Sequence, residues 1–209
     1  MISVYERLLS AFGPQDWWPG DSPFEVCVGA ILTQNTNWEN VRKAISNLKD
    51  KDLLSPRAIY ELPRQSLAQI IRSAGYYNVK AERLQNFVAF LVDNFEGNID
   101  TMFSKGLETL RPMLLDIKGI GPETADSILL YAGELPSFVV DVYTVRALMR
   151  HDFIDENADY EGVRSLFMDH LPADVELYNE YHALWVILGK NFCKKTKPRC
   201  EECPLNELF

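Results

Sequence analysis

The stretch that most constrains the fold runs from Leu115 to Arg146 and reads LDIKGIGPETADSILLYAGELPSFVVDVYTVR. Gly119 and Gly121 bracket Ile120 in a tight turn, and Pro122 stands where the first residue of a helix would be. Glycine suits such a turn because it has no Cβ to forbid a positive φ, and proline suits a first helical position because its missing N–H is no loss there. Apolar residues on both sides complete the pattern, which predicts a helix, a Lys-Gly-Ile-Gly hairpin and a second helix.

Asp141 follows the apolar run FVV at 138–140 in the same stretch. A lone carboxylate there is costly to bury unless it caps a helix or takes part in chemistry. Two interpretations therefore stay open, an N-cap for a helix that begins near Tyr143 or a catalytic group. The N–H groups behind the glycines also allow two interpretations, a plain connector between helices or a phosphate-binding turn.

Helical spacing of apolar residues recurs along the whole chain, and no stretch alternates convincingly with the period of a strand. The 209 residues are enough for one large or two small domains and are predicted to be all-α. No run of about 18 apolar residues exists, and the start MISVYERLL is charged, so a cytoplasmic protein without a membrane span is expected. Helices are predicted at 3–12, 26–32, 36–48, 65–74, 79–95, 122–132, 142–151, 159–170 and 173–191. A short helix is also predicted to start at Ser55-Pro56, a further element at Asp100-Thr101, and residues 106–115 lead into the hairpin.

The net charge of −9 argues against nucleic acid as a partner at first sight. Basic residues nevertheless crowd one loop near the C-terminus, and Lys118 lies in the hairpin itself. Phosphate contact needs a local positive face rather than a basic average, so a nucleic-acid partner stays open. The basic residues of the loop are Lys194, Lys195, Lys197 and Arg199, and Lys190 precedes them.

The combination of the Gly119–Gly121 hairpin with Asp141 further along the chain resembles the helix-hairpin-helix DNA glycosylases of the endonuclease III superfamily. The segments FEVCVGAILTQNTNWENV at 24–41 and SAGYYNVKAERL at 73–84 resemble the same family, so the resemblance covers most of the chain. It implies an all-α, two-lobed fold with a cleft between the lobes. The implied lobes are 22–130, with the helix-hairpin-helix at about 107–132, and 1–21 plus 131–209, with the cysteine cluster at 193–203.

The resemblance also implies roles for residues of the hairpin and of one loop. In the family the hairpin amides hold a DNA phosphate, which assigns that contact to Lys118, Gly119 and Gly121. A family glutamine on an interhelical loop enters the DNA, which assigns intercalation to Gln34 and Asn35. Polar residues at these two positions also suit a plain turn between two helices.

A second set of residues resembles the 3-methyladenine DNA glycosylase III group of this family. Trp17, Trp18 and Pro19 match its Trp-Trp-Pro loop residue for residue, and Trp38 falls where that group has a base-stacking aromatic. Indole faces hold a flipped base by stacking and favour a cationic alkylated purine through a cation–π interaction. The alternative for each tryptophan is that it fills space in the core.

The resemblance assigns Asp141 to the chemistry at the flipped nucleotide, and Glu123 bears on the mechanism. Bifunctional members of the family have a lysine two residues after the second hairpin glycine, where this chain has Glu123. Because a carboxylate cannot form a Schiff base, we expect a monofunctional DNA glycosylase that uses water. Its partner would be double-stranded DNA with a damaged base, most simply an alkylated purine, and the protein would act as a monomer.

Two other functions stay open. One is an endonuclease III-like glycosylase and AP lyase on oxidised pyrimidines, with the lyase residue elsewhere. The other is a non-catalytic helix-hairpin-helix protein that binds DNA. The tryptophan loop and Glu123 argue against the first, and the retained Asp141 argues against the second.

The C-terminal cysteines read Cys193-x6-Cys200-x2-Cys203, whereas the family binds a [4Fe–4S] cluster through Cys-x6-Cys-x2-Cys-x5-Cys. The fourth position is occupied by Phe209. An iron–sulfur cluster is therefore expected with three cysteines, and an outside ligand, a three-iron cluster and a lost cluster stay open. Zinc fits less well, since only Cys200 and Cys203 have zinc-like spacing. His182 falls inside a predicted helix and is interpreted as structural.

Overall fold

The structure is a computed structural model that describes residues 1–15, 17 and 20–206. Every regular element in these residues is helical, which confirms the predicted all-α class. No helix of the described residues is long and apolar enough to cross a membrane. The helices are α1 (Ile2–Phe12), α2 (Pro23–Leu32), α3 (Trp38–Lys49), α4 (Pro56–Glu61), α5 (Arg64–Ile70), η1 (Arg72–Ala74), α6 (Tyr77–Phe95), α7 (Ile99–Phe103), α8 (Leu107–Leu115), α9 (Pro122–Ser127), η2 (Ile128–Ala132), α10 (Val142–Arg150), α11 (Tyr160–Met168), α12 (Val175–Asn191) and η3 (Cys200–Glu202).

The chain forms two compact units. Residues 19–135 form the first, here called the hairpin unit because it contains the Gly119–Gly121 turn. Residues 1–18 and 136–209 form the second, here called the aspartate unit because it contains Asp141. The lobe boundaries implied by the resemblance, 22–130 and the remainder, and the cleft between the lobes stay predictions.

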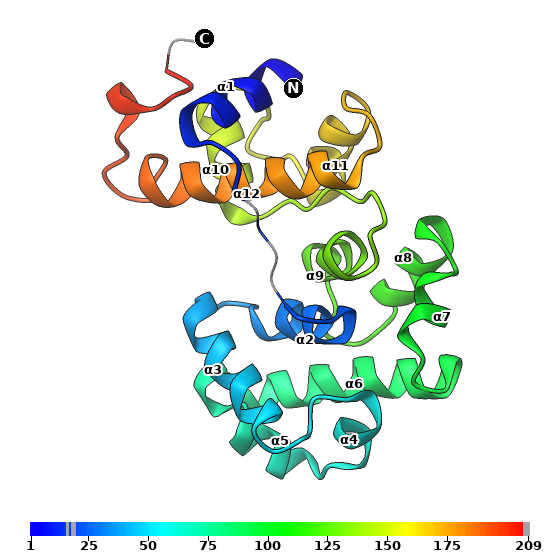
Figure 1. Cartoon of the computed structure of the whole chain (residues 1–209). Helices are drawn as coiled ribbons and strands as arrows, with labels where there is room; N and C mark the ends of the chain where they lie inside the picture. The colour runs from blue at the N-terminus through cyan, green and yellow to red at the C-terminus, as the bar shows by residue number, and fades with distance from the viewer. Residues whose placement is uncertain (16, 18–19, 207–209) are drawn as a thin grey trace. The chain divides into compact units, whose positions relative to one another are not determined.

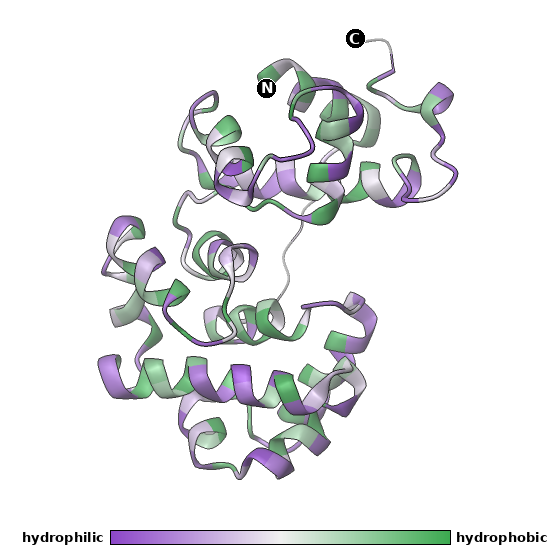
Figure 2. Ribbon diagram, turned by 180° about the vertical axis from the view of Figure 1, so that it is seen from behind, coloured by the Kyte–Doolittle hydropathy of each residue, from purple (hydrophilic) through white to green (hydrophobic). Residues whose placement is uncertain are grey.

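Helix α6 is the centre of the hairpin unit, with α2 on one side and α4 and α5 on the other (Figure 1). Its buried face carries Leu84, Phe87, Val88 and Leu91, so its apolar side is covered by these helices. Figure 2 shows hydrophobic and hydrophilic stretches alternating along this long helix, as expected when one face is buried and the other is exposed.

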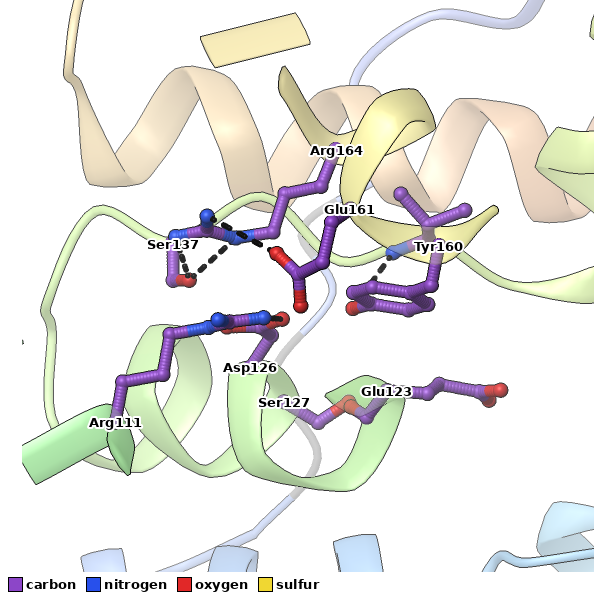
Figure 3. Close-up of polar contacts among 9 residues, drawn as sticks. Arg111, Glu123, Asp126, Ser127, Ser137, Tyr160, Glu161 and Arg164 are labelled. Atoms are coloured by element: carbon purple, nitrogen blue, oxygen red, sulfur yellow. Dashed lines mark hydrogen bonds and ion pairs between the residues drawn. The ribbon is translucent and has the colours of Figure 1, made fainter. Parts of the chain in front are cut away.

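Helices α8 and α9 flank the hairpin, and a buried ion pair joins them. Asp126 of α9 is fully buried, and its two carboxylate oxygens accept hydrogen bonds of 2.8 and 3.0 Å from Nε and an Nη of Arg111 on α8 (Figure 3). Such a two-pronged arrangement fixes the angle between the two side chains. The ion pair thereby helps to fix the orientation of α8 relative to α9, the two helices that the hairpin connects.

In the aspartate unit, α12 is buried along most of its length and packs against α1 and α10. Phe138 stacks on Phe167 with ring centres 3.8 Å apart and 8° between the planes, and Tyr181 stacks on Trp185. Phe138 also meets Tyr181 edge to face. This aromatic cluster anchors the extended segment that leads into Asp141.

Two of the predicted helices depart from regular α-helix within their predicted bounds. The predicted helix 65–74 is divided into α5 and η1, and the carbonyl of Ala74 at its end accepts a hydrogen bond from Lys80. The predicted helix 122–132 widens to a π-helix over η2, where a Cβ on Gly133 would lie 2.5 Å from Phe103. Both departures involve tertiary contacts, which helical periodicity does not report.

Candidate functional site

The hairpin depends on Gly119, which has a φ of +96°. A Cβ at this residue would lie 2.4 Å from Cγ of Arg83, a side chain of α6 that packs against the turn. Gly121 is different, because it has an extended backbone, caps α9, and has nothing within 4 Å of a Cβ built on it. Between them, Ile120 is buried and attaches the turn to the core. The first glycine is therefore required by conformation and by space.

Replacing Gly119 by alanine is expected to lower the free energy of unfolding by about 1–3 kcal/mol, because a non-glycine residue is strained at this φ and Arg83 must move. Gly121→Ala is the matched control and should cost about 1 kcal/mol, the typical value for a helix-cap change, because the backbone is extended and a built Cβ meets nothing within 4 Å. Urea unfolding of both variants measures the difference. Equal losses would show that the turn tolerates a side chain at both positions.

Lys118, the third residue predicted to contact phosphate, lies on the surface of the hairpin. Its ammonium pairs with Glu82 of α6 at 2.8 Å, and its side chain is 83% exposed. The hydrogen bond from Lys118 lowers the pKa of the Glu82 carboxyl. The backbone carbonyl of Lys118 accepts a hydrogen bond from the side chain of Asn86. Because exposed ion pairs are weak, a phosphate can compete with Glu82 for this ammonium.

The structure brings Gln34 to the hairpin from 85 residues away in the chain. Its side-chain amide donates to the carbonyl of Gly119 at 3.2 Å and to the hydroxyl of Thr124 at 2.9 Å, while its oxygen accepts from Arg83. Asn35 follows at the exposed tip of the turn with a left-handed φ of 53°. The predicted intercalation loop and the predicted phosphate-binding hairpin therefore form one polar surface of the hairpin unit.

Lys80 binds backbone carbonyls next to the Gln34 loop, and the sequence analysis did not identify it. Its ammonium is 1% exposed and donates to the carbonyls of Leu32 at 2.8 Å and Ala74 at 2.7 Å. Burial, with a smaller effect from the charge of Arg83, lowers the pKa of Lys80 to about 8. The available signal was its position, one helical turn before Leu84 on the apolar face of α6.

Tyr76 is a second residue that sequence reasoning left out. It precedes α6 with a left-handed φ of 46°, and 72% of it is exposed. Lys80 joins the turn at Ala74, just before Tyr76, to the end of α2, so Tyr76 belongs to the same side of the hairpin unit as the Gln34 loop. An exposed aromatic ring at a left-handed backbone position marks Tyr76 as a candidate contact residue, and both properties come from the structure and not from the sequence.

The residues predicted for the base pocket fall in both units. Trp38 begins α3, is 39% exposed, and lies against Gly29 of α2, where a Cβ would come within 3.2 Å of the indole. Trp17 belongs to the aspartate unit. Trp18 and Pro19 lie outside the described residues.

Asp141 is the N-cap of α10, so the capping interpretation describes its structure correctly. One carboxylate oxygen, Oδ1, accepts three hydrogen bonds, from the amide of Tyr143 at 3.0 Å and from the amide and hydroxyl of Thr144 at 2.8 and 2.9 Å. The other oxygen, Oδ2, faces Nε2 of His182 at 3.6 Å. The cap fixes the carboxylate through one oxygen only, which leaves a catalytic use of the other oxygen open.

The ionisation of Asp141 reflects opposing effects. Burial acts to raise the pKa of the carboxyl, since only 8% of the residue is exposed. His182 and the hydrogen bonds from Thr144 act the other way and prevail, so the pKa lies below its ordinary value. Asp141 is therefore an anion at neutral pH and suits the stabilisation of a nearby positive charge.

His182, interpreted from the sequence as structural, lies beside the candidate catalytic carboxylate. It comes from the buried part of α12, and the indole of Trp17 stacks on its ring at 5.8 Å with 25° between the planes. A signal for it was an ionisable residue between Tyr181 and Trp185 in a largely apolar helix. The sequence did not show which residue it meets.

Arg146 joins two helices of the aspartate unit through backbone carbonyls. Its guanidinium donates to the carbonyl of Cys193 at 2.6 Å and to that of Gly189 at 3.1 Å, and it lies over the ring of Tyr143. These contacts join α10 to the end of α12. They also lead into the loop that carries the cysteines.

The three C-terminal cysteines line one cavity of about 330 Å³ in the aspartate unit. Burial is the main reason that the pKa of Cys203 is raised, and the neighbouring Cys193 and Cys200 raise it further. Arg150 donates to Sγ of Cys193 at 3.2 Å. Within the described ranges, no three His, Cys, Asp or Glu side chains are grouped as ligands for a single metal ion. The cavity is lined by Arg150, His151, Asp152, Phe192, Cys193, Arg199, Cys200, Cys203 and Asn206.

Comparison with known sequences identifies relatives of this chain. The profile of the HhH-GPD superfamily, described as base excision DNA repair protein, matches residues 28–173. The chain is 49% identical over 210 residues to a candidate DNA repair glycosylase of Methanocaldococcus jannaschii, covering 100% of this chain and 94% of the relative. It is 29% identical over 185 residues to Endonuclease III of Sulfolobus acidocaldarius, covering 88% and 80%.

Two solved structures resemble the chain over most of its length. An Endonuclease III in a non-covalent complex with DNA has a TM-score of 0.83 at 25% identity, covering 98% of this chain and 91% of that one. The 3-methyladenine DNA glycosylase of H. pylori, bound to 1,N6-ethenoadenine, has a TM-score of 0.74 at 30% identity, covering 90% and 96%. These similarities confirm the fold class predicted from the hairpin and the aspartate.

Proposed function

The chain belongs to the HhH-GPD superfamily of base excision DNA repair proteins, and on that premise we propose that this DNA glycosylase is monofunctional and hydrolyses the N-glycosidic bond of a flipped, alkylated purine. The observation that carries the proposal is Asp141, an ionised and almost fully buried carboxylate with one oxygen anchored by three hydrogen bonds. Such a group is held rigidly where positive charge develops, which is how a preorganised site lowers a barrier.

In the proposed reaction the damaged nucleotide leaves the base stack, and its sugar meets Asp141. As the bond from C1′ to the base breaks, positive charge develops on the sugar, and the carboxylate stabilises that charge. Water then adds to C1′ on the face opposite the leaving base, with Asp141 orienting it or accepting its proton. The products are the free base and an abasic site.

Glu123 supports a reaction without strand cleavage, because lyase chemistry needs an amine that forms a Schiff base. The residue stands in the first turn of α9, and its carboxylate cannot do this. Lys80, whose pKa of about 8 would suit a nucleophile, is 1% exposed and has its ammonium bound by two carbonyls. Burial therefore makes Lys80 a poor candidate for a lyase residue.

We propose that DNA binds through the polar surface of the hairpin unit. Amides at Gly119 and Gly121 and the ammonium of Lys118 would hold a backbone phosphate. Gln34 and Asn35 would enter the duplex where the damaged nucleotide has left, and the exposed ring of Tyr76 would stack on a neighbouring base. The hydrogen bonds between Gln34 and the hairpin support a single binding surface.

The proposed base pocket consists of Trp17, Trp18, Pro19 and Trp38. The relative of known structure that is 30% identical holds 1,N6-ethenoadenine, a modified purine, which supports a purine for this chain as well. Aromatic walls favour a large, electron-poor base by stacking and offer few hydrogen bonds. Selectivity would then rest largely on the lesion, because a methylated purine has a weakened glycosidic bond.

Trp38→Ala is expected to lower excision of 3-methyladenine by about 1–3 kcal/mol, or about 5- to 150-fold, the worth of one stacking contact. Tyr60→Ala is a matched control, since Tyr60 is a similarly exposed aromatic residue of α4 in the same unit. Single-turnover excision assays on a methylated duplex measure both. Equal rates for the two variants would remove Trp38 from the pocket.

We also propose an iron–sulfur cluster held by Cys193, Cys200 and Cys203. Three thiols on one cavity are a suitable donor set, and a cluster holds its ligands further apart than a single ion does, so the lack of a single-ion site in the described residues is no obstacle. When bound, the cluster would cross-link the loop 193–203 through thiolate–iron bonds.

Iron and acid-labile sulfide should be found in the purified protein, with a broad absorption in the visible range. Cys200→Ala should reduce the iron and sulfide content. Cys27→Ala should leave the iron and sulfide content unchanged, because Cys27 is buried in α2 of the other unit. A wild-type protein purified anaerobically without iron would contradict the cluster.

A panel of lesion-bearing duplexes, assayed with and without alkali, tests the proposed function. Nicking of a 3-methyladenine duplex only after alkali would show base removal without lyase action. Nicking without alkali at thymine glycol would favour the second candidate, a bifunctional endonuclease III-like enzyme. That candidate is supported by the similarity to the Sulfolobus enzyme. Binding to every duplex with no excision would leave a DNA-binding protein.

A further inference from the structure

We infer that His182 is a positioning residue for Asp141, and that Trp17 holds His182 in this role. The inference rests on the proposed function, because it assumes that Asp141 takes part in excision. It extends that function by adding a residue that acts through the carboxylate and by giving Trp17 a second task. The three residues come from three places in the aspartate unit, namely α12, the start of α10 and the segment after α1.

The two oxygens of Asp141 have different environments. Oδ1 accepts three hydrogen bonds from Tyr143 and Thr144, and these are the hydrogen bonds by which Asp141 caps the helix. Oδ2 takes no part in the cap and faces Nε2 of His182 at 3.6 Å. The hydrogen bonds to Oδ1 already limit rotation of the carboxylate about its Cβ–Cγ bond, which leaves small tilts that a contact at the second oxygen can restrict further. The imidazole opposite the second oxygen restricts that tilt and therefore sets where the catalytic oxygen points.

Close packing of two helices puts the imidazole in this place. Gly189 of α12 lies so near α10 that a Cβ on it would come within 2.4 Å of the Tyr143 ring. Arg146 then joins the helices by donating to the carbonyl of Gly189. His182 lies two helical turns before Gly189 on the same buried helix, and its Nε2 lies 3.6 Å from Oδ2 of Asp141, the N-cap of α10.

Trp17 restricts the imidazole by stacking on its ring. The two rings are stacked at 5.8 Å with 25° between their planes, and His182 is only 7% exposed. A stacked indole fixes the plane of the imidazole and keeps water from it. One face of Trp17 is thereby used by His182, so a flipped base would use the opposite face or the edge of the indole. A base bound there would contact the residue that supports the positioning of the carboxylate.

The charged side chains of these two helices have partners elsewhere, so among the described residues His182 is the titratable neighbour that lowers the pKa of Asp141. Arg146 donates to backbone carbonyls, and Arg150 donates to Sγ of Cys193. Glu180 accepts from the amide of Gln15. The remaining charged residues of α12, Glu176 and Lys190, are exposed near its ends.

The first test titrates the carboxyl of Asp141 by carbon-13 NMR on aspartate-labelled protein, with Asp141→Asn to assign the resonance. His182→Phe keeps a ring for Trp17 but removes Nε2, so the midpoint of the titration should move to higher pH. The sign follows because His182 lowers the pKa of this carboxyl. His182→Gln supplies a neutral N–H, so its midpoint should lie between those of His182→Phe and the wild type.

The second test is single-turnover excision across pH. For His182→Phe, the acid limb should move to higher pH and the rate constant at neutral pH should fall about 10- to 100-fold, the usual cost of a misplaced catalytic group. His182→Gln should recover part of the rate. His170→Phe is the control, because His170 is an exposed residue of the aspartate unit whose ring bonds a carbonyl within its own helix end. It should leave the midpoint and the rate constant at wild-type values.

Trp17→Ala tests whether the indole both lines the base pocket and holds His182. It should raise the Asp141 midpoint as well as reduce excision, whereas Trp38→Ala should reduce excision and leave the midpoint unchanged. An Asp141 midpoint and an acid limb that stay at wild-type values in both His182 variants would overturn the inference. If the wild type excises no lesion, the proposed function fails, and the carboxyl titration still decides whether His182 controls Asp141.

Discussion

Replacing Asp141 by asparagine is expected to reduce base excision by about 100- to 10,000-fold, the range for losing a positioned acid–base group, while DNA affinity stays near that of the wild type. The negative charge matters most when positive charge develops on the sugar, so its loss weakens the transition state more than the ground state. Asparagine is also a good N-cap, so the hydrogen bonds to Oδ1 can be kept and the fold should persist.

Asp174→Asn provides the matched control for this prediction. Asp174 caps α12 in the same unit, and its side chain accepts a hydrogen bond of 2.7 Å from the amide of Leu177. Single-turnover excision, fluorescence anisotropy with lesion DNA and thermal unfolding should distinguish the two aspartates by excision alone. If Asp141→Asn lost affinity or folding in step with activity, Asp141 would be a structural cap and no more.

Arg111→Met is expected to lower the free energy of unfolding by about 3–5 kcal/mol, because it leaves the Asp126 carboxylate buried without its guanidinium. The Asp126 side chain is fully buried and that of Arg111 is 15% exposed, so water replaces little of the lost interaction. The change also removes the contact that joins α8 to α9 (Figure 3). Affinity for undamaged DNA should therefore fall as well, because these helices present the hairpin.

Two further variants make the Arg111 prediction specific. Arg57→Met removes an exposed ion pair with Glu61, at side-chain exposures of 81% and 60%, and should change stability by no more than about 1 kcal/mol. Adding Asp126→Leu to Arg111→Met removes the buried charge that has lost its guanidinium and should recover most of the lost free energy of unfolding. Urea unfolding at neutral pH measures all three. A loss for Arg111→Met no larger than that for Arg57→Met would show that the buried pair contributes little.

Local sequence patterns predicted much of the hairpin unit. A proline after the second glycine and apolar residues on either side of the turn are short-range features, and they indicate helix ends directly. The positive φ of Gly119 follows from the same pattern. The pattern did not distinguish the two glycines. Only the position of Arg83 against the turn shows that Gly119 has no room for a side chain, whereas Gly121 does.

The sequence by itself determined the all-α class, the hairpin and the place of Asp141 at the start of a helix, because these depend on residues a few positions apart. The tertiary structure decided which side chains meet. It placed Gln34 on the hairpin, Lys80 against the carbonyl of Leu32 next to the Gln34 loop, and His182 beside Asp141. These contacts join residues tens of positions apart, and they depend on how the helices pack, which helical periodicity does not specify.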